Sequence, residues 1–335
     1  MSRRRENWKQ CSRDQTRGKV TRHPDSAQQI IVLDNCALND ILVRNPSGHL
    51  ADGIRVAALK HQIAVWTSPS LVAETVAGSG TDRASARKKL ALLRVVSGGH
   101  MLKHARDLFE WEGLNGCAPS DTDRFMPRDE EEVVYEQSLA VCDAGGIMLN
   151  SEDGSERVIR ELIYEEKAAG QRAALKATDA TRQGVIRAFE ASLGNSDADP
   201  TETQRLTEHG GGIDLPALGK WIRSISRDDF ARWVSVMLED LGYKRVVTAD
   251  DLPLLPHATS AAGYFLAKIA GNYVNGQKWQ KNDTYDARYC VAASQADILV
   301  TTDIRLQALC AQMPYRPFRT SGIRELAGIL VQSSQ

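Results

Sequence analysis

Long apolar runs are missing from this sequence, and so is any paired spacing of cysteines. No segment approaches the length of a membrane span, and the arginine-rich N-terminus is not followed by the apolar core of a signal peptide. The six cysteines are scattered without a C-x-x-C pair, which argues against a disulfide framework and against a cysteine zinc site. These absences favour a cytoplasmic protein with no membrane segment.

A net charge is also nearly absent. The 335 residues include 42 lysines and arginines and 43 acidic residues, so the formal net charge is −1 and gives no overall attraction to nucleic acid. The seven histidines form no pair with metal-ligand spacing, and the glycine-rich stretches lack the Lys-Ser or Lys-Thr of a phosphate-binding loop. Only residues 1–29 are clearly basic. We expect them to form a polar, disordered tail, which is either a weak nucleic-acid contact or a solvated leader.

What the sequence does contain is an alternation of short apolar runs and helical patterns. The run IIVL, which ends at Asp34, predicts a strand buried on both faces. Expected strands lie at 30–34, near 63–66 and within 97–104, and expected helices lie at 36–45, 69–77 and 84–96. Ser68 or Ser70 is expected to cap the second of these helices, with Pro69 in its first turn. The alternation predicts an α/β fold with a parallel sheet.

The pattern changes between residues 105 and 274. Charged helical stretches and acidic, loop-like segments predominate there, and no strand pattern is convincing, so we interpret 105–274 as a helical insertion or cap domain. The alternation returns at 275–330, with a helix, the strand ILVTTD, an edge strand in PYRPFRT and a final helix at 323–331. The α/β domain is therefore expected to be split into 30–104 and 275–330.

Acidic residues follow both of the clearest strands. Asp34 ends the first run and Asp303 ends ILVTTD, and the carboxyl ends of parallel strands meet at one edge of a sheet. Asp283 and Asp286 share a face of the helix before ILVTTD, and Glu74 lies near the start of a helix that leaves the same edge. Each acid also has a structural interpretation, as a helix cap or a solvated residue. Their joint placement predicts a cluster of carboxylates.

Carboxylates gathered in one place repel one another, and a divalent cation relieves that repulsion. Ligands that are all oxygen, without histidine or cysteine, favour Mg²⁺ or Mn²⁺ over zinc. Such a site can activate a water molecule and stabilise the displaced oxygen of a phosphodiester. The residues themselves therefore indicate metal-dependent phosphoryl hydrolysis.

Three segments of the chain resemble the PIN-domain nuclease superfamily, in particular its large bacterial members. They are IIVLDNCALNDIL, SPSLVAETV and NDTYDARYCVAASQADILVTTDIRL, and the last is the most specific because a helix acid precedes a strand that closes in T-x-D. The resemblance implies a three-layer α/β/α fold with a central parallel sheet, and an enzyme that cuts single-stranded or structured RNA. It also implies an Mg²⁺ or Mn²⁺ site formed by Asp34, Glu74, Asp286 and Asp303, with Asp283 as a further candidate ligand.

One position departs from the family pattern. Members usually have Ser, Thr or Asn two residues after the first acid, where this chain has Cys36, and the adjacent Asn35 is expected to take over the orienting hydrogen bond. Asn35 and Thr301 are also candidates for substrate contacts, as are Lys278 and Lys281, which can hold a phosphate or lie beside a stacked base. The resemblance further implies a toxin or defence effector with an inhibitory protein partner. The sequence leaves the oligomeric state open and is compatible with a homo-oligomer.

Two other functions stay open. A nucleic-acid-binding or scaffold protein with an inactive PIN-like site is compatible with Cys36 and with the large insertion. An unrelated α/β phosphohydrolase would use Asp34 as its nucleophile, but that chemistry usually has a second acid at the position that Cys36 occupies. Metal-dependent cleavage of RNA is the hypothesis that the residues and the resemblance favour together.

Overall fold

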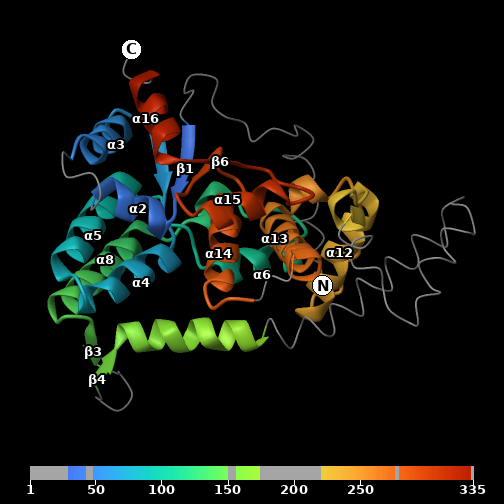
Figure 1. Ribbon diagram of the computed structural model, residues 1–335, viewed down its shortest axis with the longest axis horizontal. Helices are drawn as coiled ribbons and strands as arrows, with labels where there is room; N and C mark the ends of the chain where they lie inside the picture. Colours follow the sequence, from blue (N-terminus) through green and yellow to red (C-terminus); the bar gives the residue numbers. More distant parts are fainter. Residues whose placement is uncertain (1–28, 43–47, 150–155, 174–219, 276–278, 333–335) are drawn as a thin grey trace, which may run out of the picture.

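A four-stranded parallel sheet forms the centre of the fold (Figure 1). The computed structural model describes residues 29–42, 48–149, 156–173, 220–275 and 279–332. The strands of the sheet are β1 (Gln29–Leu33), β2 (Ile63–Trp66), β5 (Ile298–Val300) and β6 (Arg319–Ser321), in the order β2-β1-β5-β6. Every neighbouring pair is parallel, so the predicted α/β fold with a parallel sheet is confirmed. Of the tail expected at 1–29, only Gln29 is among the described residues.

Helices surround the sheet, and α4 begins at the signal that the sequence carries. Ser68 caps it by accepting a hydrogen bond from the Leu71 N–H at 3.3 Å, and Pro69 is in the first turn, as predicted. The α-helices are α2 (Asn35–Leu42), α3 (His49–Leu59), α4 (Pro69–Ala77), α5 (Arg83–Ser97), α6 (Ala105–Asn115), α7 (Asp121–Arg124), α8 (Arg128–Asp143), α12 (Arg227–Asp240), α13 (Pro256–Asn275), α14 (Asp283–Ala293), α15 (Ile304–Ala311) and α16 (Ile323–Gln332). Two short 3₁₀ helices are η1 (Gly78–Gly80) and η2 (Leu252–Leu254).

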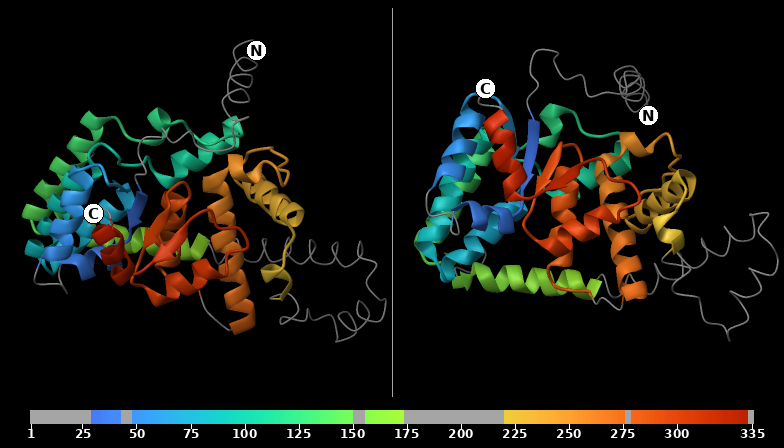
Figure 2. Two further views of the ribbon diagram at one scale, coloured as in Figure 1. Left: turned by 90° about the horizontal axis from the view of Figure 1, so that it is seen from above. Right: turned by 45° about the horizontal axis from the view of Figure 1, so that its top comes forward.

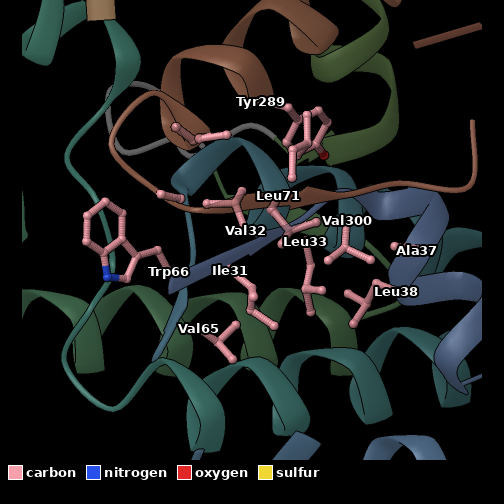
Figure 3. Packing of buried hydrophobic residues seen from close by; sticks show 14 of the residues in the cluster. Ile31, Val32, Leu33, Ala37, Leu38, Val65, Trp66, Leu71, Tyr289 and Val300 are labelled. Carbon is pink, nitrogen blue, oxygen red and sulfur yellow. The ribbon is translucent and has the colours of Figure 1, made fainter. Parts of the chain in front are cut away.

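Strand β1 is paired on both sides, which explains its continuous apolar sequence. In the register of the sheet, Ile31 lies opposite Val65 of β2 and Ile298 of β5. Helix α14 packs on β1 and β5, and its Tyr289 lies over the sheet opposite α5 (Figure 3). A central strand covered in this way holds the residue that follows it, Asp34, in a fixed position.

The segment predicted as a helical insertion also contains two strands. β3 (Ile147–Leu149) and β4 (Glu156–Val158) form an antiparallel hairpin, so the prediction of no strand in 105–274 is wrong. Each strand has only three residues and pairs only with the other, so neither has the buried alternation by which a strand can be recognised in a sequence. Residues 159–173 continue from β4 as a helix, which crosses the bottom of Figure 1.

Two other predictions of secondary structure need correction. The strand expected within 97–104 is reduced to isolated pairings, of Thr67 with Met101 and of Leu102 with Phe125. Helix α3 was not predicted, although its apolar residues Leu50, Ile54 and Ala57 are buried. Its apolar pattern spans only three turns and follows Pro46 and Gly48 directly in the sequence, so it is too short to show a clear helical period.

A second apolar cluster lies beside the one that contains the sheet. It joins α12, α13 and η2 with Trp279, and α13 links the two clusters because it packs on α14, α6 and α15 (Figure 2). Trp233 of α12 is buried in this cluster. Because α13 packs on α14, the second cluster also supports α14 and helps to fix the positions of the acids on that helix.

The structure also bears on membrane-spanning segments and on the cysteines. Among the described residues, no helix combines the length and apolarity needed to cross a bilayer. Cys36, Cys142, Cys290 and Cys310 are free, whereas Cys117 is disulfide-bonded.

Candidate metal and active site

Asp34 follows β1 directly and lies at the carboxyl edge of the sheet. Its N–H extends the ladder to the Val300 carbonyl at 3.1 Å. Its Oδ1 caps α2 by accepting the Ala37 N–H at 2.6 Å, and its Oδ2 accepts a hydrogen bond from the Thr301 hydroxyl. Burial raises the pKa of Asp34 to about 6, although these two hydrogen bonds lower it. An ionised Asp34 is therefore costly unless a positive charge shares its surroundings.

Asp303 begins α15 and is linked to Asp34 through Thr301. Its Oδ1 accepts the N–H groups of Arg305 at 2.8 Å and Leu306 at 3.2 Å, which makes it the cap of α15. Its own N–H donates to the Thr301 Oγ1 at 3.0 Å, and that hydroxyl donates to Asp34. Thr301 is fully buried, so it holds the two acids together rather than making the predicted substrate contact. Asp303 Oδ2 makes no hydrogen bond with the described residues.

The two acids of α14 have different surroundings. Asp286 lies 3.5 Å from the Arg305 guanidinium, and burial raises its pKa to about 7 although Arg305 lowers it. Asp283 is buried in an ion pair with Lys268 of α13 at 3.0 Å, and its carboxylate also accepts the Gln280 N–H at 2.5 Å. Asp283 thus joins α14 to α13, and its role as an extra metal ligand stays a prediction. Both contacts are to Oδ2, whereas Oδ1 is buried 3.7 Å from the Arg305 guanidinium and has no hydrogen-bond partner among the described residues.

Glu74 lies on α4 and points toward α14, where both of its oxygens have partners. The Lys167 ammonium donates to Oε1, and the Tyr289 hydroxyl donates to Oε2. Burial raises the pKa of Tyr289 well above its ordinary value, and the Glu74 charge contributes, so this phenol stays a donor. In this arrangement the Glu74 carboxylate is neutralised and fully hydrogen-bonded.

Cys36 lies in the midst of these acids. Burial raises the pKa of its thiol to about 12, and the negative charges of four acids raise it further, in the order Asp34, Asp303, Glu74 and Asp286. The side chain is nevertheless exposed, so the space around it is open to solvent. Cys36, the residue that departs from the pattern of the PIN family, therefore lies within electrostatic reach of all four acids.

Thr301 and not Asn35 orients Asp34, and Lys281 lies against another side chain. The buried Asn35 Oδ1 has no hydrogen-bond partner in the described part of the chain, and Thr301 makes the orienting hydrogen bond to Asp34 that was expected of Asn35. The Lys281 ammonium bonds the Tyr164 hydroxyl and lies 3.6 Å from the centre of its ring. Lys278 lies outside the described residues. Thr301 could replace Asn35 because the fold brings it to Asp34 from 267 positions away.

The acids fit a hard divalent cation by their chemistry but are not arranged as a coordination shell. All candidate donors are carboxylate oxygens, as Mg²⁺ and Mn²⁺ prefer, and repulsion between the charges favours a cation among them. Within the described ranges, no three His, Cys, Asp or Glu side chains are grouped closely enough to hold a metal ion. Glu74 is held by Lys167 and Tyr289, and Asp286 faces Arg305. Side-chain movement is therefore needed before three ligands meet.

Four residues that shape the site were not predicted from the sequence. Tyr289 and Lys167 bind Glu74, Arg305 faces Asp286, and Lys268 pairs with Asp283. Arg305 and Tyr289 lie inside the segment that resembles the family, so the sequence offered a place to search for them. Lys167 and Lys268 lie in the 105–274 region, where they look like ordinary helix residues.

A cavity of about 580 Å³ lies on the side of α14 that faces away from Asp286. Phe109, Trp233, Phe265 and Trp279 are among the residues that line it. Because the α14 residues Ala287 and Val291 line it too, the helix separates the cavity from the acids. We therefore treat the cavity as distinct from the candidate site.

The interpretation of the site depends on its own residues, because no protein-family model, no curated protein and no solved structure matches the chain. The resemblance of three short segments to PIN-domain nucleases is a prediction that these residues alone support.

Proposed function

We propose that the chain is a metal-dependent ribonuclease of the PIN type, with the three-layer α/β/α arrangement of that family. Asp34, Asp286 and Asp303 would hold Mg²⁺ or Mn²⁺, and Glu74 would join them when it is free of Lys167. The bound ion supplies an activated water and neutralises charge on the phosphodiester.

One observation supports the proposal above all others. Acids from three distant segments converge around Cys36: Asp34 after β1, Glu74 on α4, and Asp286 and Asp303 on either side of β5. The carboxyl edge of a parallel sheet is where such folds bind their ligands. Carboxylates are rarely crowded in this way without a cation, because each raises the cost of ionising the others.

The side chains around the acids have specific tasks in this proposal. Thr301 and the Ala37 N–H fix the Asp34 carboxylate, and the cap that Asp303 makes on α15 leaves its Oδ2 free for a ligand. Arg305 lies at the same edge and can hold a phosphate oxygen, because its guanidinium is a partly exposed donor 3.5 Å from Asp286.

The test is cleavage of mixed single-stranded RNA in Mn²⁺ by the wild type and by Asp34→Asn and Asp303→Asn. Asparagine caps helices as well as aspartate does, so both variants keep the helix starts while they lose the negative charge. Asp297→Asn is the matched control, because Asp297 lies at the amino end of β5, where it accepts the Ile30 N–H at 2.8 Å. We expect the two site variants to lose cleavage about 100-fold or more, since loss of a partner of a ligand already costs about 10- to 100-fold.

EDTA should abolish cleavage by the wild type, and Asp297→Asn should cleave like the wild type. Cleavage that survives both Asp34→Asn and Asp303→Asn, or no cleavage of any RNA by the wild type and by Lys167→Met, would refute the nuclease proposal. The variant of Lys167 is included because that lysine occupies Glu74.

A nucleic-acid-binding or scaffold protein with an inactive site is the second candidate, and one observation favours it. Lys167 pairs with Glu74, Lys268 with Asp283 and Arg305 with Asp286, so three of the five predicted acids already have protein cations. An inactive protein would bind RNA equally well in EDTA and in Mn²⁺ and would cut it in neither. Filter binding of labelled RNA in both buffers distinguishes the two functions.

A further inference from the structure

A helical arm, residues 159–173, lies across the candidate site from outside. In Figure 1 it is the yellow-green helix that runs beneath α4 and α14. Its first residue is its apolar anchor: the Ile159 N–H donates to the Gly146 carbonyl at 2.8 Å, and the Ile159 side chain packs partly against the main cluster. Beyond this anchor the arm is attached by contacts of a different kind.

The rest of the arm docks through polar groups on one face. Tyr164, Lys167 and Gln171 are three and four residues apart, so they project from the same side. Tyr164 contacts Lys281, and the Gln171 side chain donates to the Trp279 carbonyl at 2.7 Å. None of residues 159–173 is buried. A helix that belongs to a core buries an apolar stripe fully, whereas Leu162 and Ile163 of this arm are only half-buried.

A second set of polar contacts comes from Glu166. Its carboxylate accepts the Tyr285 hydroxyl at 2.6 Å and pairs with Arg288 at 2.5 Å, and both partners are on α14. Polar contacts at a surface exchange readily with water, so they hold the arm in place without fixing it there. The arm is thus built to dock on α14 and also to leave it.

Lys167 is the residue by which the arm reaches the acids. Its ammonium pairs with Glu74 Oε1, donates to Asn282 Oδ1 at 3.1 Å, and lies 4.5 Å from the centre of the Tyr285 ring. The Lys167 side chain is 16% exposed and that of Glu74 is 11% exposed, so the pair is largely shielded from solvent. A Glu74 carboxylate held in this way cannot ligate a divalent cation at the same oxygen.

We propose that residues 159–173 are an autoinhibitory arm, in which Lys167 occupies Glu74 in place of a divalent cation until the arm leaves α14. This inference rests on the proposed function, because it concerns the same acids. It accounts for the two properties that the site combines: a convergence of carboxylates, and no three of them grouped for a metal among the described residues.

The first test compares Lys167→Met with Arg172→Met. Both changes remove one positive charge from the arm, but Arg172 is exposed and makes no hydrogen bond or ion pair with the described residues. We expect Lys167→Met to reach its half-maximal rate of RNA cleavage at an Mn²⁺ concentration about tenfold lower than the wild type needs. A tenfold change corresponds to the free energy of one shielded ion pair, which the Mn²⁺ ion no longer has to displace. Arg172→Met should need as much Mn²⁺ as the wild type.

The second test fixes the arm in its docked position with a disulfide between Gly170→Cys and Thr284→Cys. A Cβ at Gly170 would lie 3.2 Å from the Thr284 Cβ, and a disulfide needs about 3.5 to 4.5 Å, so a shift of a few tenths of an ångström suffices. We expect the protein oxidised with glutathione disulfide to cleave at least tenfold more slowly than the same protein reduced with dithiothreitol. Gly170→Cys alone, treated in the same way, controls for oxidation of Cys36.

The outcomes separate this inference from the proposed function. If the wild type cleaves RNA but Lys167→Met does not enhance cleavage, or the disulfide does not slow it, the autoinhibition proposal is refuted and the nuclease proposal is kept. Mn²⁺ binding, measured from the loss of the free-ion electron paramagnetic resonance signal, is the second readout. If no form cuts RNA but Lys167→Met binds Mn²⁺ more tightly than Arg172→Met, the autoinhibition proposal is supported and the nuclease proposal is refuted. If no form binds Mn²⁺, both are refuted.

Discussion

Removal of the Asp34 charge should stabilise the protein in the absence of divalent cations. Burial raises the pKa of this carboxyl from 3.8 to about 6, with contributions from Asp303 and Glu74, despite the hydrogen bonds from Thr301 and Ala37. A raised carboxyl pKa means that the native state favours the protonated form. In the wild type, protonated Asp34 therefore contributes to the free energy of unfolding. This contribution is fully present below about pH 4 and is lost as the pH rises through 6.

The size of the effect follows from the shift in pKa. Roughly two units correspond to about 3 kcal/mol of native-state penalty for ionised Asp34. Asp34→Asn removes this penalty and keeps an amide oxygen for the Ala37 N–H, but it disturbs the hydrogen bond from Thr301 at a cost of about 1 kcal/mol. The net gain at pH 8 is therefore about 2 kcal/mol, or a few degrees in melting temperature for a protein of this size.

The assay is urea unfolding of the wild type and of Asp34→Asn at pH 4.5 and pH 8, in EDTA. The variant should be the more stable protein at pH 8 and should have no advantage at pH 4.5. Added Mn²⁺ should stabilise the wild type and not the variant, because only the wild type binds the ion in its native state. A stability difference between the two proteins that is the same at both pH values would show that Asp34 is an ordinary helix cap.

Two further predictions concern buried acids outside the metal hypothesis. Burial raises the pKa of Glu112 from 4.5 to about 8, although the backbone N–H groups of His257 and Ala258 donate to its carboxylate. The free energy of unfolding should therefore fall by about 5 kcal/mol between pH 4.5 and 9. Urea titrations should show a smaller dependence of this free energy on pH for Glu112→Gln. Lys268→Met should lower the free energy of unfolding by about 3 kcal/mol, because the buried Asp283 carboxylate loses its ammonium partner and keeps only the Gln280 N–H and the more distant Arg305 guanidinium. The double variant with Asp283→Asn should recover most of the loss in thermal melts.

The fold was predictable wherever the burial of a segment is visible in its own apolar sequence pattern. The apolar runs that became β1 and β5 are surrounded on both faces, so burial leaves no polar position within them. The acids at their ends could be assigned to one edge of the sheet because parallel strands share direction. The hairpin β3–β4 and helix α3 were missed because short elements carry too few residues for a period to be recognised.

The partners of the acids were not predictable, for a physical reason. Whether a buried carboxylate is a ligand or half of an ion pair depends on what the fold brings to it from elsewhere. Lys268 reaches Asp283 from a neighbouring helix, and Lys167 reaches Glu74 from 93 positions away. Local pattern identifies an acid at a sheet edge, but tertiary packing decides whether its charge is already neutralised.

The choice between helix cap and metal ligand, which the sequence poses for Asp34 and Asp303, does not require one answer. Both residues are caps, because each lies where a strand at the carboxyl edge turns directly into a helix. That turn fixes the side chain through one oxygen, and the orientation of the other oxygen follows. In Asp303 the second oxygen is free of hydrogen bonds to the described residues, and in Asp34 it is steered by Thr301. Capping thus supplies the rigidity that a carboxylate site needs, and cleavage assays on the asparagine variants separate the charge from the cap because asparagine keeps one and removes the other.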